Sequence, residues 1–266
     1  MMKKQKTVAG KIVLAGLLAF ASVCRAEMYY LDKTLDPKNF VWGLVSNEVW
    51  ETSSGVECSE IKSSDVYFCI GKTVQFQIDK DKGGTFQGGS LVIGSDDSAG
   101  AGLIAQKKGA ALNFPDYASV ECGGLVLKNG MLGTRDIGST GGTKDTLKGK
   151  ITLEATSDMP FMIVDARNSR NIEINADFHG AVGSAIEFGS VFQRDVDGLD
   201  DKYKETAANK TLLLTGTFNN FFGTLAVTNK LQTASINTLG ALNSYGSRLK
   251  LDTDSVFSGK MVVNSG

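Results

Sequence analysis

The stretch LLLTGTF at residues 212–218, followed by FGTLAV at 222–227, decides the fold expected for this chain. A similar pair occurs further on, with LKLDT at 249–253 followed by FSGKMVV at 257–263. Each pair contains an alternating strand, a turn, an aromatic residue, a glycine and a second alternating strand, and the offset between the pairs is 36 or 37 positions. Imperfect repetition at this scale is typical of a solenoid, in which neighbouring repeats bury one another's apolar faces.

Short apolar or alternating runs continue this pattern toward the N-terminus. Each run is followed by Gly, Asn, Asp or Ser, as expected for strands that are joined by tight turns. The 31 Gly and only 3 Pro residues agree with such a chain, and the 42% hydrophobic content is enough to build a core. The predicted strands are Thr73–Ile78, Ser90–Ile93, Leu103–Ala105, Ala118–Glu121, Gly124–Leu127, Ile151–Ala155, Phe161–Val164, Asn171–Asn175, Ala185–Phe188, Thr211–Thr215, Thr224–Val227, Arg248–Leu251 and Lys260–Val263.

The fold class predicted from these runs is all-β, with a right-handed parallel β-helix as the architecture. Residues 27–80 are expected to form an N-terminal capping region, and residues 81–266 the solenoid. The alternative is a β-sandwich, which also has short strands at regular spacing. Asn129-Gly130 favours that alternative, because this dipeptide is a common hairpin turn.

The first 26 residues have the pattern of a secretory signal peptide. Lys3, Lys4 and Lys6 begin a basic region, and residues 12–23 form a short apolar run that is too short to span a membrane. Small residues then predict cleavage after Ala26. In the alternative, a lipoprotein, Cys24 would carry the lipid.

The charge of the remaining chain argues against a nucleic-acid partner. The signal segment holds five of the 28 basic residues and none of the 29 acidic ones, so residues 27–266 carry a net charge of −6. Nucleic-acid affinity comes largely from Lys and Arg side chains that displace counterions, and this balance is the opposite.

Three cysteines follow the signal segment, at Cys58, Cys69 and Cys122. Disulfides persist outside the cytoplasm, and Cys58 and Cys69 flank a short polar segment, so we expect these two to pair and Cys122 to be buried. In the alternative, all three are small core residues. A zinc site is not expected, since the chain has no Cys-x-x-Cys and His179 is its only histidine.

Several Gly-rich alternating runs carry a family resemblance. Trp42 and Trp50 are followed by DVYF at 65–68 and GKTVQF at 71–76, and GLVLKNG at 124–130 and FGTLAVT at 222–228 come later. These stretches resemble the passenger regions of bacterial autotransporters, and the last resembles their passenger-associated repeat. The resemblance implies a right-handed β-helix that is displayed on, or released from, the outer membrane of a Gram-negative bacterium. No translocator barrel is encoded in this chain, which would correspond to the N-terminal part of such a protein.

The stretch 193–210 interrupts the strand pattern with polar residues, and we expect it to protrude as a loop. Four aspartates in it could supply oxygen ligands to calcium, although Leu199 stands where an EF-hand has an acidic ligand. A plain solvated loop is the alternative. The SDDS run at 95–98 is expected to be an ordinary turn. The calcium candidates are Asp195, Asp197, Asp200 and Asp201.

No nucleophile motif accompanies His179, so catalysis is not the expected function. The leading hypothesis is an exported, adhesin-like interaction protein that binds an extracellular glycan or protein surface. Trp42 and Trp50 are expected to cap the N-terminal end, with stacking on sugar rings as the alternative. The second function is a polysaccharide lyase or glycoside hydrolase, which needs clustered charged residues. Its candidates are Asp165, Arg167, Arg170, Glu173, Asp177 and Glu187.

Overall fold

The computed structural model describes residues 26–31, 49–77, 84–105, 111–117, 123–134, 144–164, 171–188, 192, 194–199, 211–229, 248–251 and 256–265. Residues 1–25 of the predicted signal peptide, Trp42 and Cys122 lie outside these ranges. Within them, no helix has the length and apolar character needed to cross a membrane. The strands are β1 (Met28–Leu31), β2 (Trp50–Glu51), β3 (Val66–Cys69), β4 (Thr73–Gln77), β5 (Ser90–Ile93), β6 (Gly100–Ala105), β7 (Ala111–Phe114), β8 (Gly124–Leu127), β9 (Gly130–Thr134), β10 (Lys144–Leu153), β11 (Phe161–Val164), β12 (Asn171–Gly180), β13 (Ala185–Phe188), β14 (Thr211–Leu214), β15 (Thr224–Asn229), β16 (Arg248–Leu251) and β17 (Lys260–Ser265).

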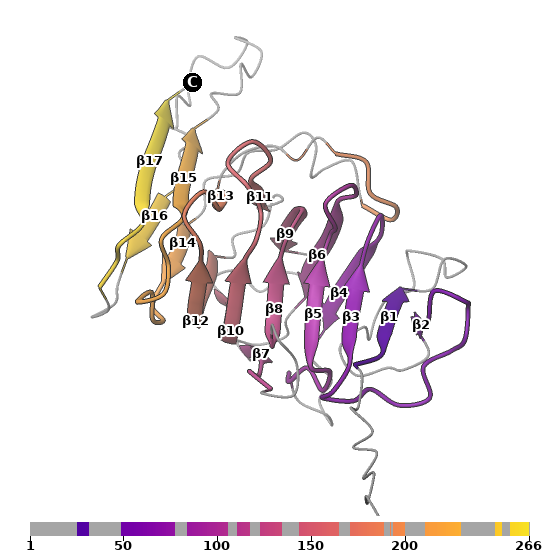
Figure 1. The fold of residues 1–266 in the computed structure, drawn as a ribbon. Coiled ribbons are helices and arrows are strands. Elements are labelled where there is room, and N and C mark those ends of the chain that lie inside the picture. Colours follow the sequence, from indigo (N-terminus) through magenta and orange to yellow (C-terminus); the bar gives the residue numbers. More distant parts are fainter. Residues whose placement is uncertain are drawn as a thin grey trace, which may run out of the picture.

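The strands form two large sheets, and the chain passes back and forth between them. A 10-stranded sheet has the order β16-β14-β12-β10-β8-β5-β3-β1-β2, with β7 also paired to β10. A 7-stranded sheet has the order β17-β15-β13-β11-β9-β6-β4. Figure 1 shows this progression as a steady change of colour, from indigo at β1 to yellow at β17. The prediction of an all-β chain is confirmed.

Nearly all strand pairs are parallel, and the antiparallel pair β1·β2 lies at one edge of the 10-stranded sheet. Parallel pairing differs from the antiparallel pairing that the β-sandwich alternative requires. Asn129-Gly130 does not make a hairpin, because the strands on either side, β8 and β9, belong to different sheets. Gly130 instead lies so close to the Gly100 carbonyl that a side chain would collide with it.

In-register pairing places buried side chains in rows that cross the sheets. In the 10-stranded sheet one row runs through β3, β5, β8, β10 and β12, and every member is almost fully buried. Like side chains are then about 4.8 Å apart, close enough for continuous van der Waals contact along the row. The row consists of Tyr67, Leu91, Leu125, Ile151 and Phe178. A second row, in the 7-stranded sheet, consists of Leu132, Ile163, Phe188 and Val227.

The long strand β10 pairs with two different neighbours. Its residues 146–149 pair with β7, and its residues 151–153 pair with β8. Gly149 is the last residue of the first segment and has a φ of 91°, which favours glycine, and a side chain there would collide with the Phe114 carbonyl. This glycine therefore allows the strand to turn from one neighbour to the next.

The sequence repeat corresponds to direct strand pairing. Leu212 pairs with Leu249, and Leu225 pairs with Met261, at the offsets predicted from the sequence. The aromatic position differs from the predicted alignment: Phe257 stacks on Phe221 rather than on Phe222, with ring centroids 5.7 Å apart. Phe221 is buried whereas Phe222 is exposed, so the inward-facing ring is the repeated one.

We predict that Gly149→Ala lowers the free energy of unfolding by about 1–3 kcal/mol more than Gly183→Ala does. Both glycines have φ near 90°, but a methyl group meets the Phe114 carbonyl at Gly149 and nothing within 4 Å at Gly183. Comparing the two variants therefore separates the effect of the steric collision on stability from the effect of backbone strain, which both share. Urea unfolding measures both, and equal losses would show that the close approach at Gly149 is unimportant.

Candidate functional site

The outer face of the 10-stranded sheet carries a row of apolar side chains. Strands β3, β5 and β8 alternate, so residues next to the buried row point to the opposite face. There, Tyr30 pairs with Phe68, Phe68 with Val92, and Val92 with Val126. The same row continues into polar residues, because Val126 pairs with Thr152 and Thr152 with His179. An outward-facing row with an apolar part of this length differs from the polar surface expected on a solvated sheet.

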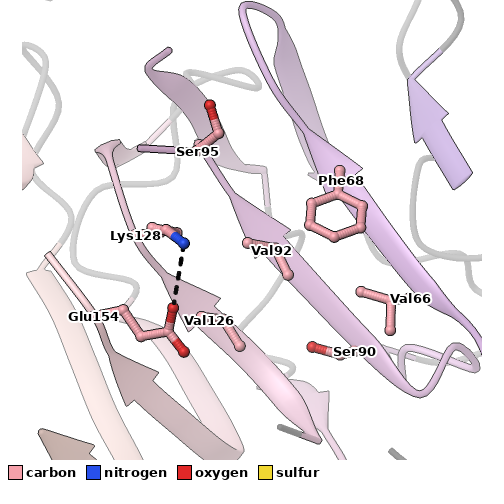
Figure 2. Close-up of a pocket in the computed structure, with 9 residues that line it drawn as sticks. Val66, Phe68, Ser90, Val92, Ser95, Val126, Lys128 and Glu154 are labelled. Carbon is pink, nitrogen blue, oxygen red and sulfur yellow. Dashed lines mark ion pairs between the residues drawn. The ribbon is translucent and has the colours of Figure 1, made fainter. Parts of the chain in front are cut away.

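These side chains line a depression of about 240 Å³, which we call the outer hollow. Phe68, Val66, Val92 and Val126 supply its apolar surface, as Figure 2 shows. Its polar edge is an ion-paired lysine: the Lys128 ammonium lies 3.2 Å from an Asp96 carboxylate oxygen and 3.9 Å from one of Glu154. The outer hollow is defined by Val66, Phe68, Ser90, Gly94, Val92, Ser95, Val126, Lys128 and Glu154.

Ser90 lies in this lining and is 1% exposed. Its hydroxyl oxygen is buried and makes no hydrogen bond with any residue that the structure describes. Burying a hydroxyl without a partner costs about 1–3 kcal/mol, and almost all buried polar groups in folded proteins have one. The unsatisfied Ser90 hydroxyl is therefore a group that a bound molecule could satisfy.

A second depression, of about 250 Å³, adjoins the outer hollow across Phe68. Its lining includes Tyr30 and Lys72, and the Tyr30 and Phe68 rings stack with centroids 5.2 Å apart. The Phe68 ring is thus the shared wall between two depressions. Offset stacking of this kind holds both rings in place.

A larger open groove, of about 720 Å³, shares Glu154 with the outer hollow. His179 lies in its lining, together with the exposed side chains of Val182 and Phe222. We call it the His179 groove. The three depressions follow one another across the strands of a single sheet, from β1 to β12.

Asp177 and His179 form a hydrogen-bonded pair beside this groove. The Nε2 atom of His179 lies 2.8 Å from Oδ2 of Asp177, and the Thr217 hydroxyl donates to Oδ1 at 2.9 Å. Partial burial raises the pKa of Asp177, but the hydrogen bonds from His179 and Thr217, with the charges of His179 and Lys150, outweigh it and lower the pKa below its ordinary value. Asp177 therefore holds the imidazole ring in place as a carboxylate.

The outer face of the 7-stranded sheet differs from that of the 10-stranded sheet, because a segment of the chain packs on it. Phe192 and Val196 pack on a cluster from β6, β9 and β11 that includes Met131 and Met162. We call Phe192 and Arg194–Leu199 the strap, and Figure 1 shows it crossing the top of the view. The protruding loop expected at 193–210 stays a prediction, since residues 200–210 lie outside the described ranges. In the described part, apolar side chains at 192, 196 and 199 pack on the sheet.

Polar contacts fix both ends of the strap. The Asp197 amide donates to the Gly71 carbonyl at 3.0 Å, and the Thr73 hydroxyl donates to the Asp197 carbonyl at 2.9 Å. At the other end the Arg194 guanidinium donates to the Asn129 side-chain oxygen at 2.6 Å and to the Pro160 carbonyl at 3.1 Å.

Of the calcium candidates, Asp195 is exposed, and the Asp197 carboxylate lies 3.9 Å from the Lys72 ammonium. Asp200 and Asp201 lie outside the described residues, so the calcium hypothesis stays a prediction. Across the part of the chain that the structure describes, no three His, Cys, Asp or Glu side chains are grouped to hold a metal ion. The SDDS run at 95–98 is a turn, as predicted, in which the Ser95 amide donates to the Ser98 carbonyl at 2.8 Å.

Of the charged residues predicted for a glycan-cleaving site, the three that the structure describes do not meet in one place. Glu173 is buried and accepts hydrogen bonds from Thr146 at 3.0 Å and Thr215 at 2.7 Å, so it links neighbouring strands. Asp177 holds His179, and Glu187 lies on β13 of the other sheet. The remaining candidates, Asp165, Arg167 and Arg170, lie outside the described residues.

Cys58 and Cys69 are thiols in the structure, so the predicted disulfide is not formed. The Cys69 thiol donates to the Lys72 carbonyl at 3.0 Å, and the Cys58 thiol donates to the Glu60 carbonyl at 3.1 Å. Burial raises the pKa of both thiols, that of Cys69 to about 12. Both residues instead belong to the core, as in the alternative derived from the sequence.

Trp50 lies on the edge strand β2 and is fully buried, with its ring edge-on to that of Tyr67 at 5.2 Å. A buried ring cannot stack on a sugar, so that alternative is wrong for Trp50. Its position at the sheet edge is where a cap would be needed.

Comparison with protein-family models, with curated proteins and with solved structures finds no match to this chain. The sequence did not indicate the outer hollow. The runs SLVI at 90–93 and GLVL at 124–127 are mainly apolar, and only strand pairing determines which of their side chains face outward.

We predict that Asp177 titrates below its ordinary pKa of about 3.9. A folded-state pKa that is depressed contributes stability above pH 4, and this stability is lost as the pH falls through the folded-state pKa. Carbon-13 NMR of the carboxyl group measures the midpoint. His179→Gln should move the midpoint upward, and a wild-type midpoint at or above 3.9 would contradict the assigned hydrogen bonds.

We predict that Cys58 and Cys69 resist iodoacetamide in the folded protein and react after denaturation without any reductant. The thiolate is the reactive form, and burial with a raised pKa suppresses it. Peptide mapping by mass spectrometry identifies each labelled residue. Failure to label either cysteine after denaturation would indicate the disulfide that the structure lacks.

Proposed function

We propose that this chain is an exported interaction protein of the autotransporter-passenger type, built on a right-handed parallel β-helix. The alternation of strands between two sheets, the parallel registers and the rows of stacked core side chains support a coiled solenoid. Right-handed connections between parallel strands are the general rule.

The outer face of the 10-stranded sheet is the proposed binding surface. The single observation that carries this proposal is the outward apolar row from Tyr30 to Val126, beside the ion pairs of Lys128. Tyr30 and Phe68 are partly exposed, whereas Val92 and Val126 are 8% and 2% exposed. An apolar depression with a polar rim is characteristic of binding sites.

Export supports an extracellular partner. The basic start, short apolar run and cleavage site before Glu27 are the reasons for placing the protein at the cell surface or in the medium of a Gram-negative bacterium. The net charge of −6 after cleavage disfavours nucleic acid. An extracellular glycan or protein surface is the partner class that remains.

Phe68→Ala should weaken binding of the purified, labelled chain to whole cells by about tenfold or more, because the ring is shared by two depressions. Flow cytometry on cultured epithelial cells and on Gram-negative bacteria measures the binding. Val56→Ala is the control, since Val56 is exposed and lies outside the three depressions. Circular dichroism checks that each variant is folded. Binding to neither cell type, or equal binding of wild type and Phe68→Ala, would refute the proposal.

A further inference from the structure

The outer hollow sets three chemical requirements on its occupant. Phe68, Val92 and Val126 are apolar, so the part of the ligand that contacts them must be compact and apolar. The buried Ser90 hydroxyl asks for one hydrogen-bonding group at depth. The polar edge at Lys128 asks for groups that can both donate and accept hydrogen bonds.

The edge also limits the charge of the occupant. Lys128 lies between Asp96 and Glu154, so its positive charge is already balanced by carboxylates. An anionic ligand would compete with both carboxylates for the same ammonium group and would be repelled by them. A neutral ligand with several hydroxyl groups can bond to the ammonium and to the carboxylates without separating them.

The Ser90 hydroxyl distinguishes a site for a polar ligand from a depression that is only apolar. A hydrophobic side chain of a partner protein would fill the hollow and leave the Ser90 hydroxyl unsatisfied, at the cost that such burial carries. The other buried oxygen without a partner, Oδ2 of Asp65, is not in this lining, and its companion Oδ1 accepts from Ser64 at 2.9 Å.

The geometry points to a neutral glycan as the ligand, with one pyranose ring seated in the outer hollow and a ring hydroxyl bonded to Ser90. A pyranose has a C–H face for Phe68 and hydroxyl groups around its rim for Ser90, Lys128 and Glu154. The inference rests on the proposed binding function and specifies its ligand class.

The neighbouring depressions extend this site along the stack of strands. The outer hollow shares Phe68 with the Tyr30 depression and Glu154 with the His179 groove. Tyr30 and His179 are five strand spacings apart in one row, about 24 Å at the usual spacing. A linear chain of several sugar units fits this length, so further units lie on either side of the first.

The decisive variant is Ser90→Ala, which removes only the unsatisfied hydroxyl. It should leave resistance to urea unchanged or increased, while weakening cell binding about tenfold. Ser184→Ala is the stability control, because the buried Ser184 hydroxyl donates to the Ala181 carbonyl at 2.8 Å and its loss should destabilise. Unchanged cell binding by Ser90→Ala would overturn the assignment of this hydroxyl to a ligand.

Treatment of the epithelial cells and bacteria before binding identifies the ligand class. Mild periodate, which cleaves vicinal diols of sugars, should abolish binding, and neuraminidase, which removes anionic sialic acid, should leave it intact. Binding that survives periodate but not protease would indicate a protein partner, and loss after neuraminidase a charged sugar. Either result overturns the neutral-glycan inference while the Phe68-dependent interaction function stands. Absence of Phe68-dependent binding to untreated cells would instead refute the function itself.

Discussion

In-register hydrogen bonding between parallel strands is the constraint on which the rest of the structure depends. Side chains alternate with a period of two, so a slip of one residue between β5 and β8 would exchange Leu91 and Leu125 with Val92 and Val126. Apart from Ser90 and Gly124 at their first positions, these strands consist of Leu, Val and Ile, so such a slip would cost little apolar burial. Register must therefore be fixed elsewhere, and the close approach of Gly94 to the Asn129 backbone is one contact that fixes it.

The strand positions could be predicted largely from the sequence, and the exceptions have physical causes. Ser90–Ile93 and Phe161–Val164 match the predicted bounds because a glycine or proline marks one end of each run. The strand at 130–134 was missed because Asn129-Gly130 has the pattern of a hairpin turn. Strand β10 is longer than predicted because Gly149 lets it continue through a change of neighbour.

The candidate site could not be predicted from the same patterns. An apolar run such as VYFC at 66–69 indicates a buried strand, but not which of its side chains stay on the outer face. Ser90 looks like an ordinary residue at a strand boundary, and its lack of a partner emerges only from packing. The strap had a signal that could have been used, since Phe192, Val196 and Leu199 are apolar anchors within a polar stretch.

The two outer faces together argue for binding more strongly than either does alone. Both sheets place apolar side chains on the outside, so this property comes from the parallel architecture and its nearly continuous apolar strands. On the 7-stranded sheet Phe192 and Val196 bury that surface, and hydrogen bonds at Asp197 and Arg194 hold them down. On the 10-stranded sheet the corresponding surface is a hollow whose lining includes the buried hydroxyl of Ser90. Among the residues that the structure describes, the chain covers one face with its own side chains and keeps a depression on the other, which is the arrangement expected where the second face binds a ligand.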